Sequence, residues 1–163
     1  MAYSHIANPS EEEELPAPFT IRPVAPADRP RWEPLWQGYL TFYKAKLPPE
    51  VTDLTWRRFF DGLEPMHAFV AEEGAALIGI VHYLYHRSTW MIGPNCYLQD
   101  LFTAEAGRGK GVGRALIEAV YAQAAKEGAT RVYWHTHETN KTAQALYEKV
   151  ATLSGFIQYR KEV

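Results

Sequence analysis

The chain has 163 residues, of which 47% are hydrophobic and 22% charged, a composition typical of one globular domain with its own core. Its formal net charge of −2 depends on the run Glu11–Glu14, without which 15 acidic residues stand against 17 basic ones. That slight basic excess is far below what nucleic-acid binding requires, and no apolar run is long enough to span a membrane, so we expect neither partner.

The chain opens with a segment that we predict to be a mobile acidic leader. Residues 1–18 contain three prolines and the four glutamates but no Lys or Arg, and they lack the basic start and apolar run of a signal peptide. We therefore expect a single domain over residues 19–163. Its one cysteine, Cys96, excludes an internal disulfide, fits a reducing cytoplasm, and is expected to be a buried apolar residue.

The first part of this domain is predicted to be a strand followed by two helices. Alternating side chains predict a strand over residues 19–24, and Pro26–Asp28 then opens a helix with an aromatic stripe at helical spacing. The stripe consists of Trp32, Trp36, Tyr39 and Tyr43. Such a stripe is more often core than ligand site. A second helix is predicted over residues 50–62.

A hairpin is predicted next, with strands over residues 66–72 and 75–87 joined at Glu73-Gly74. Apolar side chains occupy both faces of the second strand. A strand of this kind suits the centre of a sheet that carries helices on both sides.

The most informative stretch runs from Tyr97 to Arg114, where a predicted strand leads through a glycine-rich loop into a helix that continues to Lys126. The loop combines glycines at alternate positions with basic side chains: Gly107, Gly109, Gly111 and Gly113 with Arg108, Lys110 and Arg114. Glycines let the backbone approach a ligand closely, and a helix N-terminus offers free N–H groups and a positive dipole end. The stretch therefore predicts a phosphate or pyrophosphate site.

Two common phosphate-binding motifs do not fit this loop. The Rossmann fingerprint requires Gly or Ala at its sixth position, and the three possible frames have Val112, Arg114 or Leu116 there. A P-loop requires Ser or Thr after its Gly-Lys pair, which here is followed by Gly111. A nucleotide-binding protein is therefore disfavoured.

A second motif follows a strand predicted over residues 131–136. It reads Glu-Thr-Asn-Lys-Thr-Ala-Gln-Ala-Leu-Tyr over residues 138–147. On a helix, Asn140, Ala143 and Tyr147 share one face. A final strand is predicted over residues 155–162.

Together, Arg108-x-x-Gly111-x-Gly113 and the Asn140-to-Tyr147 pattern resemble motifs A and B of the GNAT superfamily of acyl-CoA N-acyltransferases. The resemblance covers residues 19–163 and implies an α/β (α+β) fold, with a mixed central sheet of about six to seven strands flanked by about four helices. It also implies an enzyme with acetyl-CoA as co-substrate, no metal, and a homodimer.

The resemblance further implies where acetyl-CoA binds. The glycine loop would hold the pyrophosphate, backbone amides of the preceding strand would pair with the pantetheine and polarise the thioester carbonyl, and the second motif would approach the sulfur. The implied cofactor-binding residues are Leu101, Phe102, Thr103, Arg108, Gly109, Lys110, Gly111, Val112, Gly113, Arg114, Asn140 and Ala143. Tyr147 aligns with the family's general acid, which protonates the leaving thiolate.

The general base stays open. The polyamine acetyltransferases, which this chain resembles at Tyr-Leu-x-Asp-x-Phe, have Glu where this sequence has Gln99, and Gln cannot accept a proton at neutral pH. Either water relays the proton to Asp100, His82, His86 or His135, or the enzyme binds the minority neutral amine. On a regular strand Asp100 faces away from Gln99, so both cannot point at one substrate atom. The candidate catalytic residues are thus Tyr147, Gln99 and Asp100.

The favoured function is transfer of acetyl from acetyl-CoA to a primary amine within a ternary complex. The acceptor is a small molecule such as a polyamine, or a lysine side chain. A protein-lysine or histone acetyltransferase and a non-catalytic acyl-CoA sensor are the alternatives, although a sensor is expected to lack Tyr147. The acceptor pocket is expected to draw on Trp36, Tyr43, Trp56, His82 and Tyr85. Paired histidines make a metal site conceivable, but no Cys or acidic residues complete one, so structural histidines are the better prediction.

Overall fold

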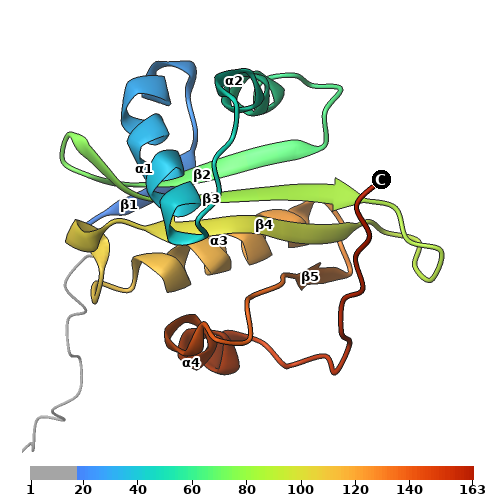
Figure 1. Cartoon of the computed structure of the whole chain (residues 1–163). Coiled ribbons are helices and arrows are strands. Elements are labelled where there is room, and N and C mark those ends of the chain that lie inside the picture. The colour runs from blue at the N-terminus through green and yellow to red at the C-terminus, as the bar shows by residue number, and fades with distance from the viewer. Residues whose placement is uncertain (1–17) are drawn as a thin grey trace, which may run out of the picture.

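In the computed structural model, residues 18–163 are described, and the predicted leader lies outside them except for its last residue. Five strands form one sheet in the order β1-β2-β3-β4-β5, with helices on both faces (Figure 1). The elements are β1 (Thr20–Pro23), η1 (Pro26–Asp28), α1 (Arg29–Phe42), α2 (Pro49–Arg58), β2 (Met66–Glu73), β3 (Ala76–His86), β4 (Asn95–Thr103), η2 (Glu105–Gly107), α3 (Val112–Lys126), β5 (Arg131–Tyr133) and α4 (Lys141–Val150).

The sheet is antiparallel from β1 to β4, whereas β5 joins β4 in parallel. Strand β5 is short and pairs only with Asn95, Cys96 and Tyr97 at the start of β4. Beyond Tyr97 the two strands separate, so the rest of β4 has an open edge on that side. This open edge matters for the site described below.

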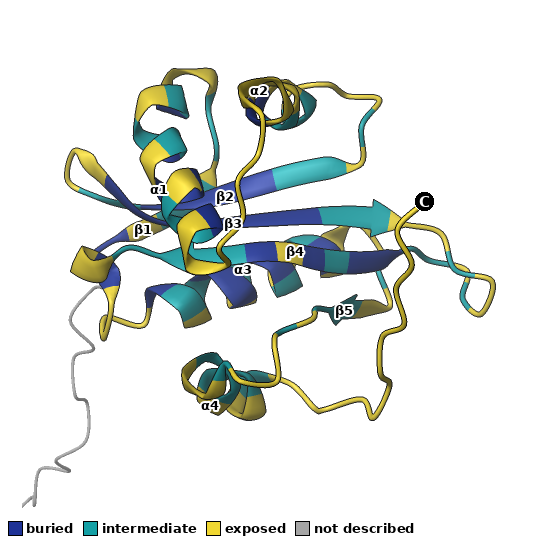
Figure 2. Ribbon diagram, viewed as in Figure 1, coloured by how far each residue is buried: buried dark blue, intermediate teal, exposed yellow. Residues whose placement is uncertain are grey.

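Two hydrophobic cores lie on opposite faces of the sheet. One packs α3 against the sheet through residues such as Leu116, Ile117 and Cys96, which is fully buried as predicted. The other packs α1 and α2 on the opposite face around Trp32 and Ile80. Figure 2 shows the buried residues concentrated along β2, β3 and β4, as expected for central strands covered on both sides. The aromatic stripe of α1 is thus largely core.

The α/β class, the mixed sheet and the four α-helices agree with prediction, but the expected six to seven strands were wrong. The sheet has five strands. Residues 152–163, which include the predicted final strand, carry no strand pairing, and Phe156 and Tyr159 are 81% and 89% exposed. Their composition favours an extended chain, but a strand also requires a partner edge to satisfy its backbone.

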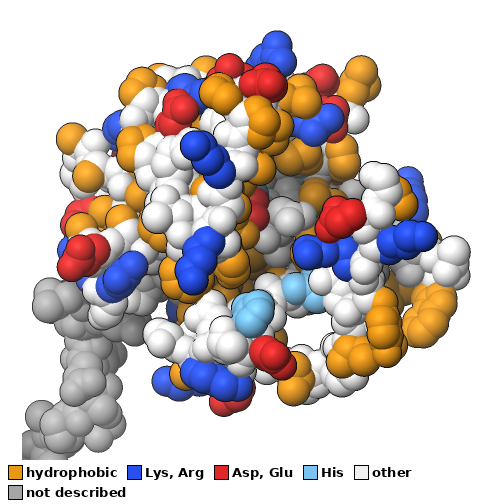
Figure 3. All heavy atoms as spheres, in the orientation of Figure 1, with side chains coloured by type: hydrophobic (Ala, Val, Ile, Leu, Met, Phe, Trp, Pro, Cys, Tyr) orange, Lys and Arg blue, Asp and Glu red, His pale blue; other side chains and the backbone are white. Residues whose placement is uncertain are grey.

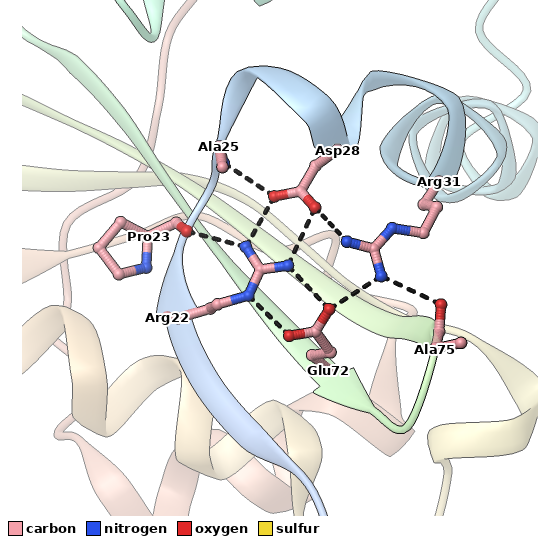
Figure 4. A network of polar contacts seen from close by, with 7 residues as sticks. All are labelled: Arg22, Pro23, Ala25, Asp28, Arg31, Glu72 and Ala75. Carbon is pink, nitrogen blue, oxygen red and sulfur yellow. Dashed lines mark hydrogen bonds and ion pairs between the residues drawn. The ribbon is translucent and has the colours of Figure 1, made fainter.

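An ion-pair network fastens the start of α1 to the sheet (Figure 4). Arg22 of β1 donates to Asp28 at 2.7 and 2.9 Å and to Glu72 of β2 at 2.8 and 2.9 Å. Arg31 of α1 donates to the same two carboxylates. Asp28 is only 1% exposed, so α1 leaves the sheet at a fixed angle. The C-terminal half of α1 is thereby held over β3 and β4.

No helix among the described residues is long and apolar enough to cross a membrane. On the face seen in Figure 3, lysine and arginine side chains are interspersed with acidic ones.

Candidate active site

A β-bulge in β4 shapes the centre of the site. Asp100 pairs with His82 of β3, but the next β3 residue, Tyr83, pairs with Leu98, so Gln99 is an extra residue with no partner. A bulge re-aims the side chains next to it. Gln99 and Asp100 consequently line the same cavity, and the expectation that they face opposite directions was wrong.

This cavity, which we name the acceptor cavity after the role proposed for it below, has a volume of about 220 Å³. It is lined by side chains from both helices of the upper layer, from the strands, and from the loop between α1 and α2: Trp36, Leu47, Thr55, Met66, His82, Tyr83, Leu84, Gln99 and Asp100. Most of this lining is apolar, and it contains one carboxylate and no Lys or Arg. The cavity therefore suits an apolar chain that ends in a cationic or hydrogen-bonding group.

Asp100 is the charged group of the cavity. Its side chain is 10% exposed and accepts a hydrogen bond from His82 at 3.0 Å, while no Lys or Arg of residues 18–163 forms an ion pair with it. Burial, and then the negative charge of Asp100, raise the pKa of Tyr39 well above its ordinary range. A buried carboxylate without a cationic partner is costly, so this position favours a positively charged ligand.

The open edge of β4 lies on the other side of the bulge. Leu101, Phe102 and Thr103 pair with β3 on one side, and on the other side β5 has already ended. Backbone groups on this edge are thus available to an extended ligand, in the way that an added strand binds.

The glycine loop leads from β4 into α3 by a backbone that only glycine adopts readily. Gly109 and Gly111 have φ values of 73° and 79°, in the left-handed region. Gly111 is the N-cap of α3 and supplies no side chain to the first-turn N–H groups. Free N–H groups and the dipole of a 15-residue helix attract anions, so this geometry is compatible with the anion site predicted for the loop, which stays a prediction.

The three basic side chains of the loop differ in their partners. Lys110 contacts Glu73 at 2.9 Å and Arg114 contacts Glu118 at 2.7 Å, both in exposed pairs that hold little free energy. Arg108 forms no ion pair within residues 18–163. Arg108 can therefore bind an anion without first breaking an ion pair with another residue of the described chain.

Helix α4 carries the second motif and lies beside the loop. Asn140 is the N-cap of α4, accepting from the backbone N–H of Ala143 at 3.4 Å. A Cβ placed on Gly113 would meet Leu146 of α4 at 3.5 Å and Thr103 of β4 at 3.7 Å. The ends of β4 and α4 and the start of α3 thus converge at one place, as the two motifs predicted.

Tyr147 of α4 is half-buried, with its ring 5.3 Å from that of Trp134 in an edge-to-face contact. Burial, with a smaller contribution from Tyr43, raises the pKa of Tyr147 to about 12. The phenol therefore stays protonated at neutral pH and can donate a hydrogen bond but accepts no proton.

Not every residue predicted to line the acceptor pocket does so. Trp36 and His82 line the cavity, whereas Trp56 packs in the core, 4.8 Å from Trp32. Tyr85 packs on the opposite, α3 side of the sheet. Leu47 and Met66 were missed, because one lies in a loop and the other at a strand end, where periodicity gives no signal.

The other two histidines considered as relays, His86 and His135, hydrogen-bond with tyrosines. His86 hydrogen-bonds with Tyr133 at 2.8 Å and His135 with Tyr97 at 3.1 Å, both at exposed positions. Within residues 18–163, no three His, Cys, Asp or Glu side chains are grouped closely enough to bind a metal ion.

Comparison with known proteins identifies the family of this chain. Residues 32–151 match the family model described as the Acetyltransferase (GNAT) family. The chain is 38% identical over 159 residues to a D-amino-acid N-acetyltransferase of Saccharomyces cerevisiae, covering 96% of this chain and 98% of the yeast protein. It is also 31% identical over 90 residues to the thialysine N-epsilon-acetyltransferase of Bos taurus, covering 50% of this chain and 52% of the bovine protein.

Solved structures of low sequence identity share the fold. An aminoglycoside acetyltransferase from an uncultured soil metagenomic sample, in complex with trehalose, aligns with a TM-score of 0.77 at 15% identity, over 92% of this chain and 99% of that chain. AAC(6')-Iy in complex with the bisubstrate analogue CoA-S-monomethyl-acetylneamine aligns with a TM-score of 0.74 at 17% identity, over 89% and 99%.

Proposed function

Because the chain belongs to the GNAT family of acetyltransferases and is an N-acyltransferase, we propose that it transfers the acetyl group of acetyl-CoA to the primary amine of a small cationic molecule. The observation that carries this proposal is Asp100, a buried carboxylate without a cationic side chain beside it among the described residues, in a cavity next to the open edge of β4.

Acetyl-CoA is proposed to bind along the open edge of β4 and into the glycine loop. The amides of Leu101–Thr103 pair with the pantetheine, the N–H groups at the start of α3 hold the pyrophosphate, and Arg108 adds a positive charge. Asn140, the N-cap of α4, and Ala143 in its first turn are proposed to face this arm. The CoA analogue bound to AAC(6')-Iy supports the cofactor class.

The acceptor is proposed to bind as an ammonium ion beside Asp100, with Gln99 as a neutral hydrogen-bonding neighbour. Asp100 takes one proton from the ammonium group, and the free amine then attacks the thioester carbonyl. Proton acceptance by a carboxylate from an ammonium group is uphill by several pKa units in water, and it becomes easier where the ion pair forms within a largely apolar cavity.

As the tetrahedral intermediate collapses, the C–S bond breaks, the nitrogen passes its second proton to the departing sulfur, and the proton held by Asp100 is released to solvent. Tyr147 is proposed to donate a hydrogen bond to the sulfur as it leaves. A phenol with a pKa of about 12 is a weaker acid than a thiol with a pKa of ~8.5, so complete proton transfer is unfavourable. Stabilisation of the sulfur by a neutral donor does not require that transfer.

The relatives' names support an amine as acceptor. The yeast relative is named for D-amino acids and the bovine one for the ε-amine of thialysine. The apolar walls formed by Trp36, Leu47 and Met66 suit a methylene chain that ends in the ammonium group. A lysine side chain within a protein has the same chemistry and is the runner-up acceptor.

A homodimer is proposed as the assembly. Its support is the C-terminal segment, residues 152–163, where large apolar side chains are exposed and no strand pairs with them. They are Leu153, Phe156, Ile157, Tyr159 and Val163. In Figures 1 and 3, exposed hydrophobic side chains gather on the side along which this segment runs.

The test is binding followed by turnover. Isothermal titration with acetyl-CoA, with NADH and ATP as controls, is expected to give micromolar binding of acetyl-CoA alone. Thiol release is then measured with diamines, D-amino acids, thialysine and a lysine-containing peptide. Turnover with free cationic amines above that with the peptide supports the proposal, whereas no release with any amine contradicts it.

A further inference from the structure

Three buried side chains from three elements form a continuous chain behind the acceptor cavity. Trp32 of α1 donates from Nε1 to Nε2 of His82 at 2.9 Å, and Nδ1 of His82 lies 3.0 Å from Oδ2 of Asp100. Trp32 is 0% exposed, His82 2% and Asp100 8%. Both ring nitrogens of His82 therefore have a partner.

The chemistry of Trp32 determines which nitrogen of His82 carries the hydrogen. An indole N–H can only donate, so Nε2 must present its lone pair. The hydrogen of the neutral ring then lies on Nδ1 and is donated to Asp100. A second proton on Nε2 would require the Trp32 hydrogen bond to break inside a packed core.

That core leaves the imidazole little freedom to turn. The rings of Trp32 and Trp36 on α1 lie 5.8 and 5.2 Å from the ring of His82, and the ring of Phe59, at the C-cap of α2, lies 4.8 Å from it. No rearrangement of His82 is possible without moving these aromatic side chains.

We propose that His82 and Trp32 are positioning residues for acetyl transfer: Trp32 holds His82 as the neutral Nδ1–H tautomer, and His82 fixes the Asp100 carboxylate toward the acceptor amine. The proposal rests on the function proposed above. One carboxylate oxygen is held by a donor, which prevents rotation of the group and keeps the other lone pairs for the substrate ammonium.

The same chain closes the route by which a proton could leave through His82. Because Nε2 already accepts from Trp32, a proton that reaches Asp100 cannot pass across the ring, and it must return to the cavity side. The other titratable groups that face Asp100 are Tyr39 of α1, Tyr43 just after α1 and Tyr97 of β4, whose pKa values are all raised by burial. These phenols stay neutral at physiological pH, so Asp100 carries the charge alone.

The test compares His82→Phe, His82→Asn and Trp32→Phe in the full chain. Phe fills the space without a donor, whereas the Asn amide places an N–H near the position of Nδ1 and is expected to rescue part of the activity. His67→Phe is the matched control, since His67 stacks on Tyr83, with a ring distance of 5.4 Å, on the other face of the sheet. Circular dichroism and acetyl-CoA affinity confirm that each variant is folded.

His82→Phe is expected to lower kcat/KM for the amine by about 100-fold, because the Asp100 carboxylate loses the donor that fixes its orientation. Acetyl-CoA affinity is expected to change less than about twofold, and His82→Asn is expected to restore part of the lost kcat/KM. If His82→Phe lowers kcat/KM no more than His67→Phe does, the proposal is overturned.

Nitrogen NMR of the His82 ring tests the arrangement without turnover. In the wild-type chain the ring hydrogen is expected on Nδ1, with Nε2 as the acceptor of the Trp32 hydrogen bond. In Trp32→Phe the Nε2 signal is expected to change, because this nitrogen loses its donor. A wild-type ring that carries its hydrogen on Nε2 overturns the proposal. The proposed function could also fail on its own. In that case the His82 ring would carry its hydrogen on Nδ1 as expected, but the protein would acetylate no amine.

Discussion

We propose that Asp100 gives the acceptor cavity its chemical preference, because it is a buried carboxylate that contacts His82 and Tyr39 but forms no ion pair with a Lys or Arg among the described residues. Gln99 beside it contributes polarity but no charge. We therefore expect Asp100 to select acceptors that carry a positive charge, and the surrounding apolar walls to select acceptors of suitable shape.

Tyr147→Phe tests the second catalytic assignment at this scale. Since burial raises the pKa of Tyr147 to about 12, the phenol is a neutral donor throughout the usual assay range and adds no basic limb to the pH profile below about pH 12. Loss of the donor is expected to lower kcat by about 10- to 100-fold while acetyl-CoA affinity is unchanged. Turnover equal to that of wild type at every pH would remove Tyr147 from the mechanism.

The residue types of the site could be predicted from the sequence, but their directions could not. Strand alternation predicted that Gln99 and Asp100 face apart, and the bulge at Gln99 brings both to one cavity. A bulge depends on how the strand pairs with its neighbour, and the local sequence pattern does not show this pairing. The Trp32–His82 contact joins residues 50 apart in the chain and was equally hidden.

At the scale of elements, the loop before α3 depends on glycine for its conformation. Gly111→Ala is expected to cost roughly 1 kcal/mol of folding free energy and to weaken acetyl-CoA binding, since φ is 79° at this N-cap. Gly62→Ala is the control, because a Cβ there meets no atom within 4 Å and its φ is not in the left-handed region. Unfolding in urea and titration with acetyl-CoA measure both effects, and equal behaviour of the two variants would contradict the role given to the loop.

The network that fastens α1 to the sheet has a pH dependence of known sign. Hydrogen bonds from Arg22, and then from the Ala25 amide and Arg31, hold the pKa of Asp28 well below its usual range, against the opposing effect of burial. A depressed folded-state pKa means that the stabilisation is complete above the unfolded pKa of ~3.9 and is lost as the pH falls below it.

Asp28→Asn is accordingly expected to lower the free energy of unfolding by roughly 3 kcal/mol at pH 7, and by less in acid as wild type itself is protonated. Glu162→Gln is the control, since its pair with Arg160 is exposed at 87% and 79%. Urea unfolding at several pH values measures the difference. A loss for Asp28→Asn that is independent of pH would show that the charge of Asp28 is not what stabilises the fold.

The order of elements up to α4 could be predicted because periodicity and turn residues are local signals. The predicted final strand failed for a non-local reason. Residues 155–162 have the composition of a strand, yet whether they pair depends on an edge supplied from elsewhere, and the chain on its own supplies none to them.

At the scale of the whole molecule, that unpaired segment bears on the assembly. If the proposed homodimer uses it, light scattering after size-exclusion chromatography is expected to give twice the chain mass of 18.6 kDa. Replacing both Phe156 and Ile157 with Asp is expected to yield a monomer, because each apolar side chain is more than three-quarters exposed in the single chain. A wild-type monomer at all concentrations would contradict the dimer.

The cytoplasmic location stays a prediction.

The fold could be predicted from two motifs, which also supply the residues proposed to bind the cofactor, whereas the lining of the acceptor cavity could not be predicted. Motif residues act through local backbone geometry, such as the left-handed glycines before α3. The acceptor cavity is assembled from α1, α2, their connecting loop and three strands, so its shape exists only after folding.

The most direct measurement is the steady-state kinetics of Asp100→Asn with the best cationic amine found for the wild-type enzyme, at saturating acetyl-CoA. The substitution keeps the size of the side chain but removes the charge and the proton acceptor. We expect kcat/KM for the amine to fall by about 100-fold or more and acetyl-CoA affinity to stay within about twofold. An Asp100→Asn enzyme that acetylates the amine as fast as wild type, at the same KM, would contradict the proposal that this carboxylate binds and deprotonates the acceptor.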